Sequence, residues 1–568
     1  MPHFKARVEL PQIPDDMTLE EFMLDYSHKL RPVRPAGTPW LVVDKTGRKV
    51  GLDEIRTRTR GLEVGVKSQF GICEDDVVLI FSKNHIDYLI CVWAMHRLLA
   101  RVSLCNPTFT NSELGHQVRQ TKPALIIAHA DVLNTAIRGA REFGLSSDRV
   151  VVLTDDDHAK YPNQTTVDEL IAKGLSLPNA PFTRKLHPGE GRKKIALLSP
   201  SSGTTGLPKV VALSHFGLIA GVLMVSSHQM SDAKYATWEE RRYRPGDISL
   251  GVVPLYHIFG VLMSHVPLFC AITVVVVPKF VFKEMLNSIV KHEINLLTIV
   301  PPQAVMLSKD PIVRQYDLTS VRVITCGGAS LSVGLTTQLA QLFPRAYIGQ
   351  AYGQTEVTGG ISMPSMSTKV GFFCGTLLPG IIARVVKSDG ALAAHNEPGE
   401  LHVKSPSVAV GYWGNEIATR ETFMDGWART GDLVMFNANE EIVYIDRLKE
   451  IIKVNGLQVS PAELEGCLHD HPMVADVCVV GLPNEKTGEV PLAFVVLTSD
   501  AALLSQEMMG TEKIKQELIQ HVAANKTRYK HVARVEFIDS IPRNPSGKML
   551  HHVLRDKALQ MGRSDAKL

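Results

Sequence analysis

The segment SPSSGTTGLPKVVALSH, residues 199–215, has a composition that is unusual for a helix or a strand. Its central nine residues, 201–209, include two serines, two threonines, two glycines, a proline and a lysine. The apolar run at 195–198 directly before it predicts a short buried strand. The hydroxyl-rich segment is therefore expected to be the loop that leaves this strand.

This loop carries the hydrogen-bond donors that bind a polyphosphate. Glycines allow backbone N–H groups to turn outward, and the hydroxyls and the Lys209 ammonium add further donors. The spacing excludes a Walker A loop, because Gly203 and Gly206 are three residues apart and Pro208 precedes Lys209. The alternative interpretation is a flexible Ser/Thr/Gly connector without a ligand.

Strands and helices alternate through the first part of the sequence. Apolar runs predict strands at 77–81, 124–128, 150–153, 195–198 and 297–300, and helical periodicity predicts helices at 88–95, 132–143, 216–228 and 303–307. A β-branched run at 272–277 predicts a further strand that is buried on both faces. This alternation predicts an α/β fold of parallel sheets with helices on their faces.

The pattern changes twice towards the C-terminus. From about residue 370, short β-rich segments at 381–386, 400–403, 434–437 and 442–445 predict a small β-barrel or twisted sheet. A charged passage then begins at Asp446, and a capping box at 460–463 with proline at the first helical position starts a new helix. We therefore predict a large N-terminal domain at 1–445 and a small α+β domain at 446–568.

Composition excludes several classes of protein. The 568 residues carry a net charge of +3, so no global field recruits nucleic acid or an anionic membrane. The eight cysteines include no Cys-x-x-Cys pair, which argues against a zinc cage or a disulfide framework and favours a reducing compartment. The N-terminus lacks the apolar core of a signal peptide. The longest apolar stretch, 261–277, is interrupted by His265 and Pro267, so no transmembrane segment is expected.

Seven motifs occur in one order along the chain. They are SSGTTGLPK at 201–209, PLYHIFG at 254–260, GGAS at 327–330, GQAYGQTE at 349–356, GWARTGDL at 426–433, DRLKEIIKVNG at 446–456 and PRNPSGKML at 542–550. Together they resemble the adenylate-forming superfamily, most closely the 4-coumarate–CoA ligases and their fungal relatives. The resemblance covers essentially the whole chain, and seven motifs in order are specific where one would be weak.

The resemblance implies an ATP-dependent carboxylic acid–CoA ligase. Such an enzyme couples the acid to AMP with release of pyrophosphate, and a thiol then attacks the acyl-adenylate. The N-terminal domain would bind AMP, and ATP, Mg²⁺ and coenzyme A would take part. The matched acyl-pocket positions favour an aromatic or medium-chain acid, and they are His257, Phe259, Met263, Ala351, Gly359 and Gly360.

The resemblance also assigns the nucleotide contacts. Phosphates are expected at Ser201, Ser202, Gly203, Thr204, Thr205, Gly206 and Lys209. The base and its surroundings are expected at Gly327, Gly328, Ala329, Gln350, Ala351, Tyr352 and Gly353. Thr355 matches the hydroxyl at the α-phosphate, and Glu356 the carboxylate that holds Mg²⁺. Asp432 and Arg447 match the groups at the ribose, and Lys453 and Gln458 match residues that contact the adenylate.

Two mobile elements are implied as well. Lys548 matches a lysine that the small domain carries into the active site by its rotation. During adenylation this lysine bridges the carboxylate and the α-phosphate. Lys449 matches the hinge, and rotation there would replace Lys548 by the CoA side, which carries Gly456 and Leu457. His257 matches a histidine that lines the path of the acid. Each of these residues would be ordinary on its own, as a solvated lysine, a turn residue or a core histidine.

Two rival functions and a localisation complete the predictions. The acyl group could pass to the thiol of a separate carrier protein, or the chain could be a non-catalytic binding protein that keeps the fold. The joint presence of the motif residues argues against the binding protein. The C-terminal tripeptide 566–568, Ala-Lys-Leu, is a variant of a peroxisomal import signal. We therefore expect an import receptor as a partner and a peroxisomal location, and a cytoplasmic location if the signal is not used.

Overall fold

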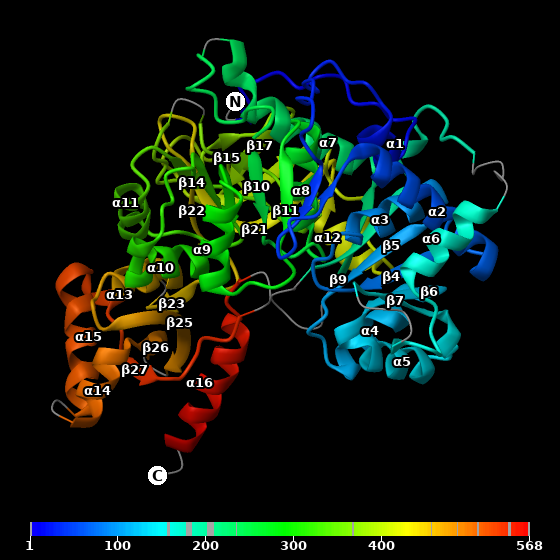
Figure 1. The fold of residues 1–568 in the computed structure, drawn as a ribbon. Coiled ribbons are helices and arrows are strands. Elements are labelled where there is room, and N and C mark those ends of the chain that lie inside the picture. The colour runs from blue at the N-terminus through cyan, green and yellow to red at the C-terminus, as the bar shows by residue number, and fades with distance from the viewer. Residues whose placement is uncertain are drawn as a thin grey trace.

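The computed structural model of the chain describes residues 3–155, 160–177, 184–201, 209–234, 236–365, 368–455, 457–484, 487–507, 510–543 and 547–565. Figure 1 shows two parts, a large one that we call the body and a smaller one at the lower left, which we call the lid and which begins at Ile452. Within the described ranges, no helix is long and apolar enough to cross a membrane.

The first sheet of the body has the strand order β19-β9-β8-β5-β4-β6-β7. The predicted runs are confirmed as the parallel strands β4 (Val77–Phe81), β6 (Leu125–His129), β7 (Val150–Leu153) and β8 (Ile195–Ser201). The strand β5 (Arg101–Cys105), which pairs with β4 and β8, was not predicted. Helices α3 (Tyr88–Arg97), α4 (Asn111–Thr121) and α5 (Leu133–Glu142) connect them. The strand β9 (Lys209–Ser214) was not predicted; it returns antiparallel to β8 and pairs Lys209 with Ser201 before α7 (His215–Gln229) begins.

The second sheet has the order β14-β13-β12-β10-β11-β2-β3. Its parallel strands are β10 (Ile248–Gly251), β11 (Thr273–Val276), β12 (Leu296–Ile299), β13 (Val323–Cys326) and β14 (Tyr347–Gln350), joined by α8 (Ile258–Phe269), α9 (Phe282–Lys291), α10 (Pro301–Lys309) and α11 (Val333–Leu342). The early strands β2 (Leu41–Val43) and β3 (Lys49–Val50) extend this sheet through β11. The α/β prediction is therefore confirmed.

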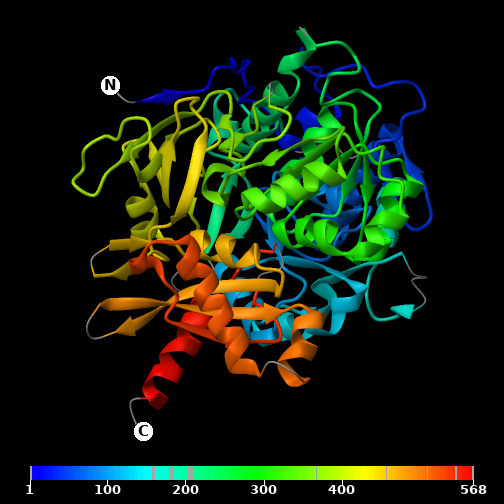
Figure 2. The same ribbon diagram turned by 90° about the vertical axis from the view of Figure 1, so that its left-hand side faces the viewer.

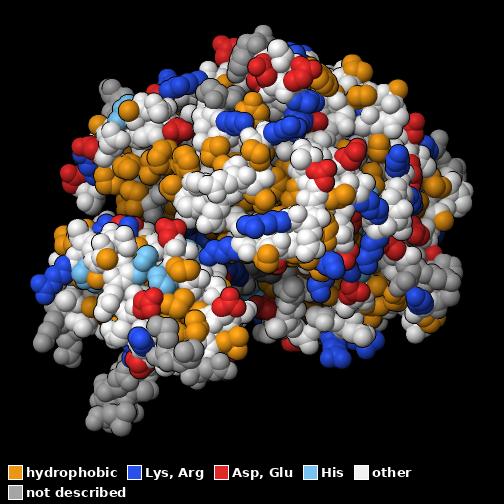
Figure 3. Space-filling view, turned by 60° about the vertical axis from the view of Figure 1, so that its left-hand side comes forward, with side chains coloured by type: hydrophobic (Ala, Val, Ile, Leu, Met, Phe, Trp, Pro, Cys, Tyr) orange, Lys and Arg blue, Asp and Glu red, His pale blue; other side chains and the backbone are white. Residues whose placement is uncertain are grey.

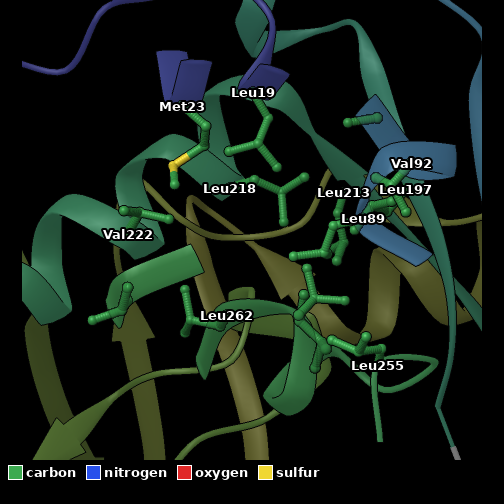
Figure 4. Close-up of a cluster of buried hydrophobic side chains, with 14 of the residues drawn as sticks. Leu19, Met23, Leu89, Val92, Leu197, Leu213, Leu218, Val222, Leu255 and Leu262 are labelled. Carbon is green, nitrogen blue, oxygen red and sulfur yellow. The ribbon is translucent and has the colours of Figure 1, made fainter. Parts of the chain in front are cut away.

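A layer of apolar side chains joins the two sheets. Figure 4 shows Leu19 and Met23 of α1 (Leu19–Leu24) packed towards Leu218 of α7, and Leu262 of α8 lies below them. All of these side chains are almost fully buried. Because interiors are packed as densely as organic crystals, this layer fixes the positions of the two sheets relative to each other.

A third sheet of the body is antiparallel and, apart from the N-terminal strand β1, is formed by residues 382–447. It has the order β1-β17-β18-β21-β20, with β22 paired to β21. Its strands are β1 (Phe4–Lys5), β17 (Ile382–Val386), β18 (Gly399–Lys404), β20 (Phe423–Met424), β21 (Trp427–Phe436) and β22 (Ile442–Arg447), and Figure 2 shows the N-terminal strand beside them. The strand order is open over the described residues, so of the two predicted forms, barrel or sheet, this part is the sheet.

The lid has its own sheet and its own apolar core. Its strands are β23 (Ile452–Val454), β24 (Leu457–Val459), β25 (Val474–Asn484), β26 (Gly488–Leu497) and β27 (Arg534–Phe537), and its helices include α13 (Pro461–His469), α15 (Thr511–Asn525) and α16 (His551–Asp565). Ser460 caps α13 as predicted, because its side chain accepts the N–H of Glu463. The Glu463 carboxylate instead pairs with Lys530, 2.6 Å away, which is a correction to the predicted capping box. The boundary at residue 446 stays a prediction.

Three histidines in the core of the body are buried as neutral rings. Burial lowers the pKa of His96 to about 3, and it lowers the pKa of His228 and of His265 to about 4. The ring of His265 accepts the indole N–H of Trp93 at 3.1 Å, and its other nitrogen lies 2.8 Å from the carbonyl oxygen of Val261. These contacts suit a neutral imidazole.

We expect these histidines to make the stability of the body depend on acid. Above pH 6.5 the rings are neutral in both the folded and the unfolded chain, so their contribution is fully present. Between pH 6.5 and about 4 only the unfolded chain takes up the protons, and each histidine then costs about 1.4 kcal/mol per pH unit. Urea unfolding at several pH values should show the midpoint falling through this range, and His265→Asn should reduce the slope. A midpoint that stays constant from pH 7.5 to 5 would contradict the prediction.

Candidate active site

A cleft of about 1400 Å³ lies between the body and the lid. Figure 3 shows the lid as a lobe at the lower left, with an indentation where it meets the body. The cleft lies at the carboxyl ends of β8, β12, β13 and β14, which is where open parallel sheets bind ligands. It brings together residues that are far apart in the sequence, namely Ser201, Lys209, His257, Tyr352, Thr355, Glu356, Arg447 and Lys548.

The Glu356 carboxylate is held by two hydroxyl groups. A short 3-10 turn at Thr355–Val357 follows β14 and buries both Thr355 and Glu356. Ser201 donates its hydroxyl to Oε1 of Glu356 at 3.0 Å, and Tyr412 donates to the same oxygen at 2.9 Å. The Lys209 ammonium lies 4.6 Å from the centre of the Tyr412 ring. The end of β8, the start of β9 and the Glu356 turn therefore meet at one point.

Tyr412 was not predicted from the sequence. It lies in the short strand β19 (Gly411–Tyr412), which adds to the edge of the first sheet beside β9. Gly411 in this strand and Gly414 in the turn that follows it both have positive φ. These glycines are a signal for a turn, but nothing in the local sequence indicates that the phenol contacts Glu356.

Asp432 is completely buried and has two charged or polar partners. The Tyr352 hydroxyl donates to Oδ2 of Asp432 at 2.5 Å, and Nε of Arg447 lies 2.7 Å from Oδ1. Burial raises the pKa of Asp432, and Arg447 and the Tyr352 hydrogen bond oppose this rise. The pair Asp432↔Arg447 also joins β21 to β22 in register. The carboxylate thus lies at the hydroxyl end of Tyr352, which lines the cleft together with Arg447, whereas Asp432 itself is not among the lining residues.

Lys548 reaches the cleft from the lid. Burial and the charge of Arg447 lower the pKa of Lys548, whereas Glu450, Asp432 and Glu356 raise it. The residue before it, Gly547, has φ +84°, and a Cβ there would lie 3.0 Å from the Val300 side chain at the start of α10. Glycine therefore allows the loop to pass close to the body and deliver the lysine.

His257 lies at the start of α8 and faces the cleft. Its Nδ1 accepts the backbone N–H of Phe259 at 3.2 Å. Burial and the nearby charge of Lys548 lower the pKa of His257 to about 4, so the ring is neutral. The predicted acyl-pocket residues all line the cleft, and apolar neighbours that were not predicted join them there, including Val225, Ile258, Leu262 and Met363.

The glycines and Gln350 have structural roles that the motifs did not reveal. A Cβ at Gly353 would lie 1.4 Å from the carbonyl oxygen of Gly359, and one at Gly327 would lie 2.8 Å from the Phe259 ring. Gln350 accepts the N–H of Leu331 and donates to the carbonyl oxygens of Leu331 and Phe372. Gly328, Ala329, Gln350, Ala351 and Gly353 line the cleft, whereas Gly327 does not. Their contacts with a base stay predictions.

Some predicted residues lie elsewhere or outside the described part. Lys453, Leu457 and Gln458 are exposed on the β23–β24 hairpin, where Lys453 and Gln458 are cross-strand partners, and none of them lines the cleft. In this lid orientation Lys453 and Gln458 lie outside the cleft, and their contact with the adenylate stays a prediction. Lys449 lies at the rim of the cleft. The positions outside the described residues are Ser202, Gly203, Thr204, Thr205, Gly206, Gly456 and the tripeptide 566–568.

Comparison with known proteins gives a consistent result. The sequence model of a family described as "AMP-binding enzyme" matches residues 33–413, and its C-terminal domain model matches residues 463–548. A 4-coumarate–CoA ligase of Pinus taeda is 32% identical and covers 97% of each chain. An acyl-CoA ligase of Glarea lozoyensis is 32% identical over 96% of this chain and 97% of its own. A benzoate CoA ligase from Burkholderia xenovorans superposes with a TM-score of 0.78 at 20% identity, covering 95% and 99%.

Proposed function

Because the chain belongs to the AMP-binding enzyme family, we propose that it is an ATP-dependent carboxylic acid–CoA ligase. It would form an acyl-adenylate with release of pyrophosphate and then transfer the acyl group to coenzyme A. The observation that carries this proposal is the position of Lys548, which the lid inserts into a cleft that also contains Glu356, Arg447 and His257. A cation placed where two anions must meet lowers the barrier to their reaction.

Each of these side chains is assigned a separate role in the first half-reaction, the formation of the acyl-adenylate. Lys209 and Ser201 lie at the two ends of the expected phosphate loop. Arg447 and Asp432 would hold the ribose, and Tyr352 offers a ring face to the base. Lys548 would lie between the carboxylate of the acid and the α-phosphate, where negative charge is closest together. The neutral His257 ring would line the path of the acid without adding charge.

We propose Glu356 as the ligand of a Mg²⁺ ion that accompanies ATP. Its oxygen atoms are hard ligands of the kind that Mg²⁺ prefers, and two hydroxyl donors hold the carboxylate in place. Bound with ATP, the ion would offset the charge of the phosphates. Thr355 lies next to Glu356 in the same turn, which supports its assignment to the α-phosphate.

The acid is proposed to be aromatic or aliphatic of medium length. Phe259, Met263, Ala351 and the apolar neighbours of α8 make a hydrophobic wall, and no ionised side chain among the predicted acyl-pocket residues would pair with a second charge on the acid. The 4-coumarate–CoA ligase and benzoate CoA ligase among the similar proteins bear the names of aromatic acids, which agrees with this assignment.

A substrate panel tests the function. The protein is incubated with ATP, Mg²⁺, CoA and a series of aromatic and aliphatic acids, and AMP and the thioester are quantified. We expect both products in equal amounts with at least one apolar acid. Adenylation without CoA turnover would favour the carrier-protein alternative, and no AMP with any acid would favour the non-catalytic alternative. Delivery to peroxisomes through the Ala-Lys-Leu tripeptide stays a prediction.

A further inference from the structure

The imidazole of His551 lies between two carboxylates three residues after Lys548. Its Nε2 is 2.9 Å from Oε1 of Glu465, which belongs to α13, and its Nδ1 is 3.4 Å from Oε2 of Glu450. The Cys478 thiol of β25 also contacts the ring, and the ligand atoms of Glu465, Cys478 and His551 all lie within 4.8 Å of one another. All four side chains are largely buried.

The two carboxylates belong to different structural units. Glu465 is fixed inside the lid, because its Oε1 also accepts the backbone N–H of Val479 at 2.9 Å. Glu450 lies in the segment that connects β22 of the body to β23 of the lid. Its backbone N–H donates to the carbonyl of Arg447, the residue paired with Asp432 in the body. His551 therefore links the lid core to the connecting segment.

A second contact on the same helix face reinforces this link. Arg555 follows His551 by four residues in α16, so the two side chains lie on one face of the helix. Nη1 of Arg555 donates to the carbonyl of Lys449 at 3.3 Å. The first turns of α16 are thus docked on residues 449 and 450, and the loop that carries Lys548 leads directly into them.

We propose that His551, as an imidazolium between Glu465 and Glu450, positions Lys548 in the cleft by tying the start of α16 to the segment that connects lid and body. It is a positioning residue, because it acts through Lys548 and not on the substrate. The role rests on the proposed function, since Lys548 is placed there for adenylation. In the thioester half-reaction Lys548 would be withdrawn from the cleft, so that half-reaction would not need His551.

The charges around the ring agree with this role. Burial alone would lower the pKa of His551, but Glu465 and the Cys478 hydrogen bond outweigh it and raise the pKa well above its usual value. Burial raises the pKa of Cys478 to about 11, so the thiol adds no charge at neutral pH. Glu450 also acts on Lys548 and raises the pKa of that amine. Without the imidazolium, Glu450 would compete with the substrate anions for Lys548.

Three variants of the full-length protein test the proposal. His551→Gln keeps hydrogen bonding but removes the charge, His551→Arg keeps the charge, and His552→Gln changes the neighbouring exposed histidine as a matched control. Adenylation is measured by pyrophosphate exchange into ATP. Thioester formation is measured separately from supplied acyl-adenylate and CoA. Hydrogen exchange followed by mass spectrometry reports the amides of residues 549–555 and needs no activity.

We expect His551→Gln to lower adenylation by about tenfold or more, because a small displacement of a reacting group has large effects. Thioester formation should stay within about twofold of wild type, and exchange at 549–555 should become faster. His551→Arg should recover most of both losses, and His552→Gln should change neither. Unchanged exchange in His551→Gln, equal loss of both half-reactions, or failure of arginine to do better than glutamine would overturn the proposal. If the wild type adenylates no acid, the proposed function fails, but the exchange data still decide whether His551 holds this loop.

Discussion

Lys548→Ala is expected to lower acyl-adenylate formation by about 10²- to 10³-fold, a loss typical of removing one preorganised group that stabilises developing charge. The Lys548 side chain lines the cleft together with Glu356, Arg447 and His257. It brings a positive charge from the lid into this set of groups. In the second half-reaction the acid is already activated and pyrophosphate has left. We therefore expect thioester formation from supplied acyl-adenylate and CoA to be almost unchanged.

The separate half-reactions make this expectation specific. Pyrophosphate exchange measures adenylation, and thioester appearance from synthetic acyl-adenylate measures transfer. Lys513→Ala is a suitable control, because Lys513 is an exposed lysine of the same lid on α15. Its removal should affect neither step. Equal loss of both steps in Lys548→Ala would show that the lysine supports the lid as a whole and has no special part in adenylation.

Most of the α/β architecture could be predicted because each unit is locally encoded. The run at 77–81 became β4 with the predicted bounds, and the β-branched run at 272–277 became the buried strand β11. The strand β9 was missed because it runs into α7 without an intervening turn. Ser214 ends the strand and also caps the helix, where its side chain accepts the N–H of Gly217. A single residue with both functions leaves no local boundary signal.

Long-range pairing set the other limit on prediction. Strand β2 joins the second sheet through β11, and β1 joins the third sheet through β17. Nothing in such short segments specifies a partner so distant in the chain, since their pairing is decided by which sheet edge is free. In the cleft, the motifs indicated Glu356 and Lys209. They did not indicate Tyr412, which contacts both residues, because Tyr412 lies on a short edge strand whose partner is also distant in the sequence.

The ion pair between the fully buried Asp432 and the largely buried Arg447 leads to the second large effect. Asp432→Ala is expected to lower the free energy of unfolding by about 3–5 kcal/mol, because it leaves the Arg447 charge and the Tyr352 hydroxyl without their buried acceptor. Exposed fractions of the two charged side chains are 0% for Asp432 and 24% for Arg447, so water replaces the lost partner poorly. Urea unfolding of the ligand-free protein measures this loss.

An exposed ion pair in the same part of the body provides the control. Glu416 and Arg420 pair at 3.0 Å across one turn of α12 (Glu416–Thr422), but 84% and 81% of their side chains are exposed. Glu416→Ala should therefore change the free energy of unfolding by no more than about 0.5 kcal/mol. If Asp432→Ala were equally mild, the buried carboxylate would not hold β21 to β22 through Arg447.

Asp432→Asn separates the two roles of this residue, because it keeps the volume and removes the charge. A raised KM for ATP, with stability lost by less than in the alanine variant, would support the assignment of Asp432 to the ribose.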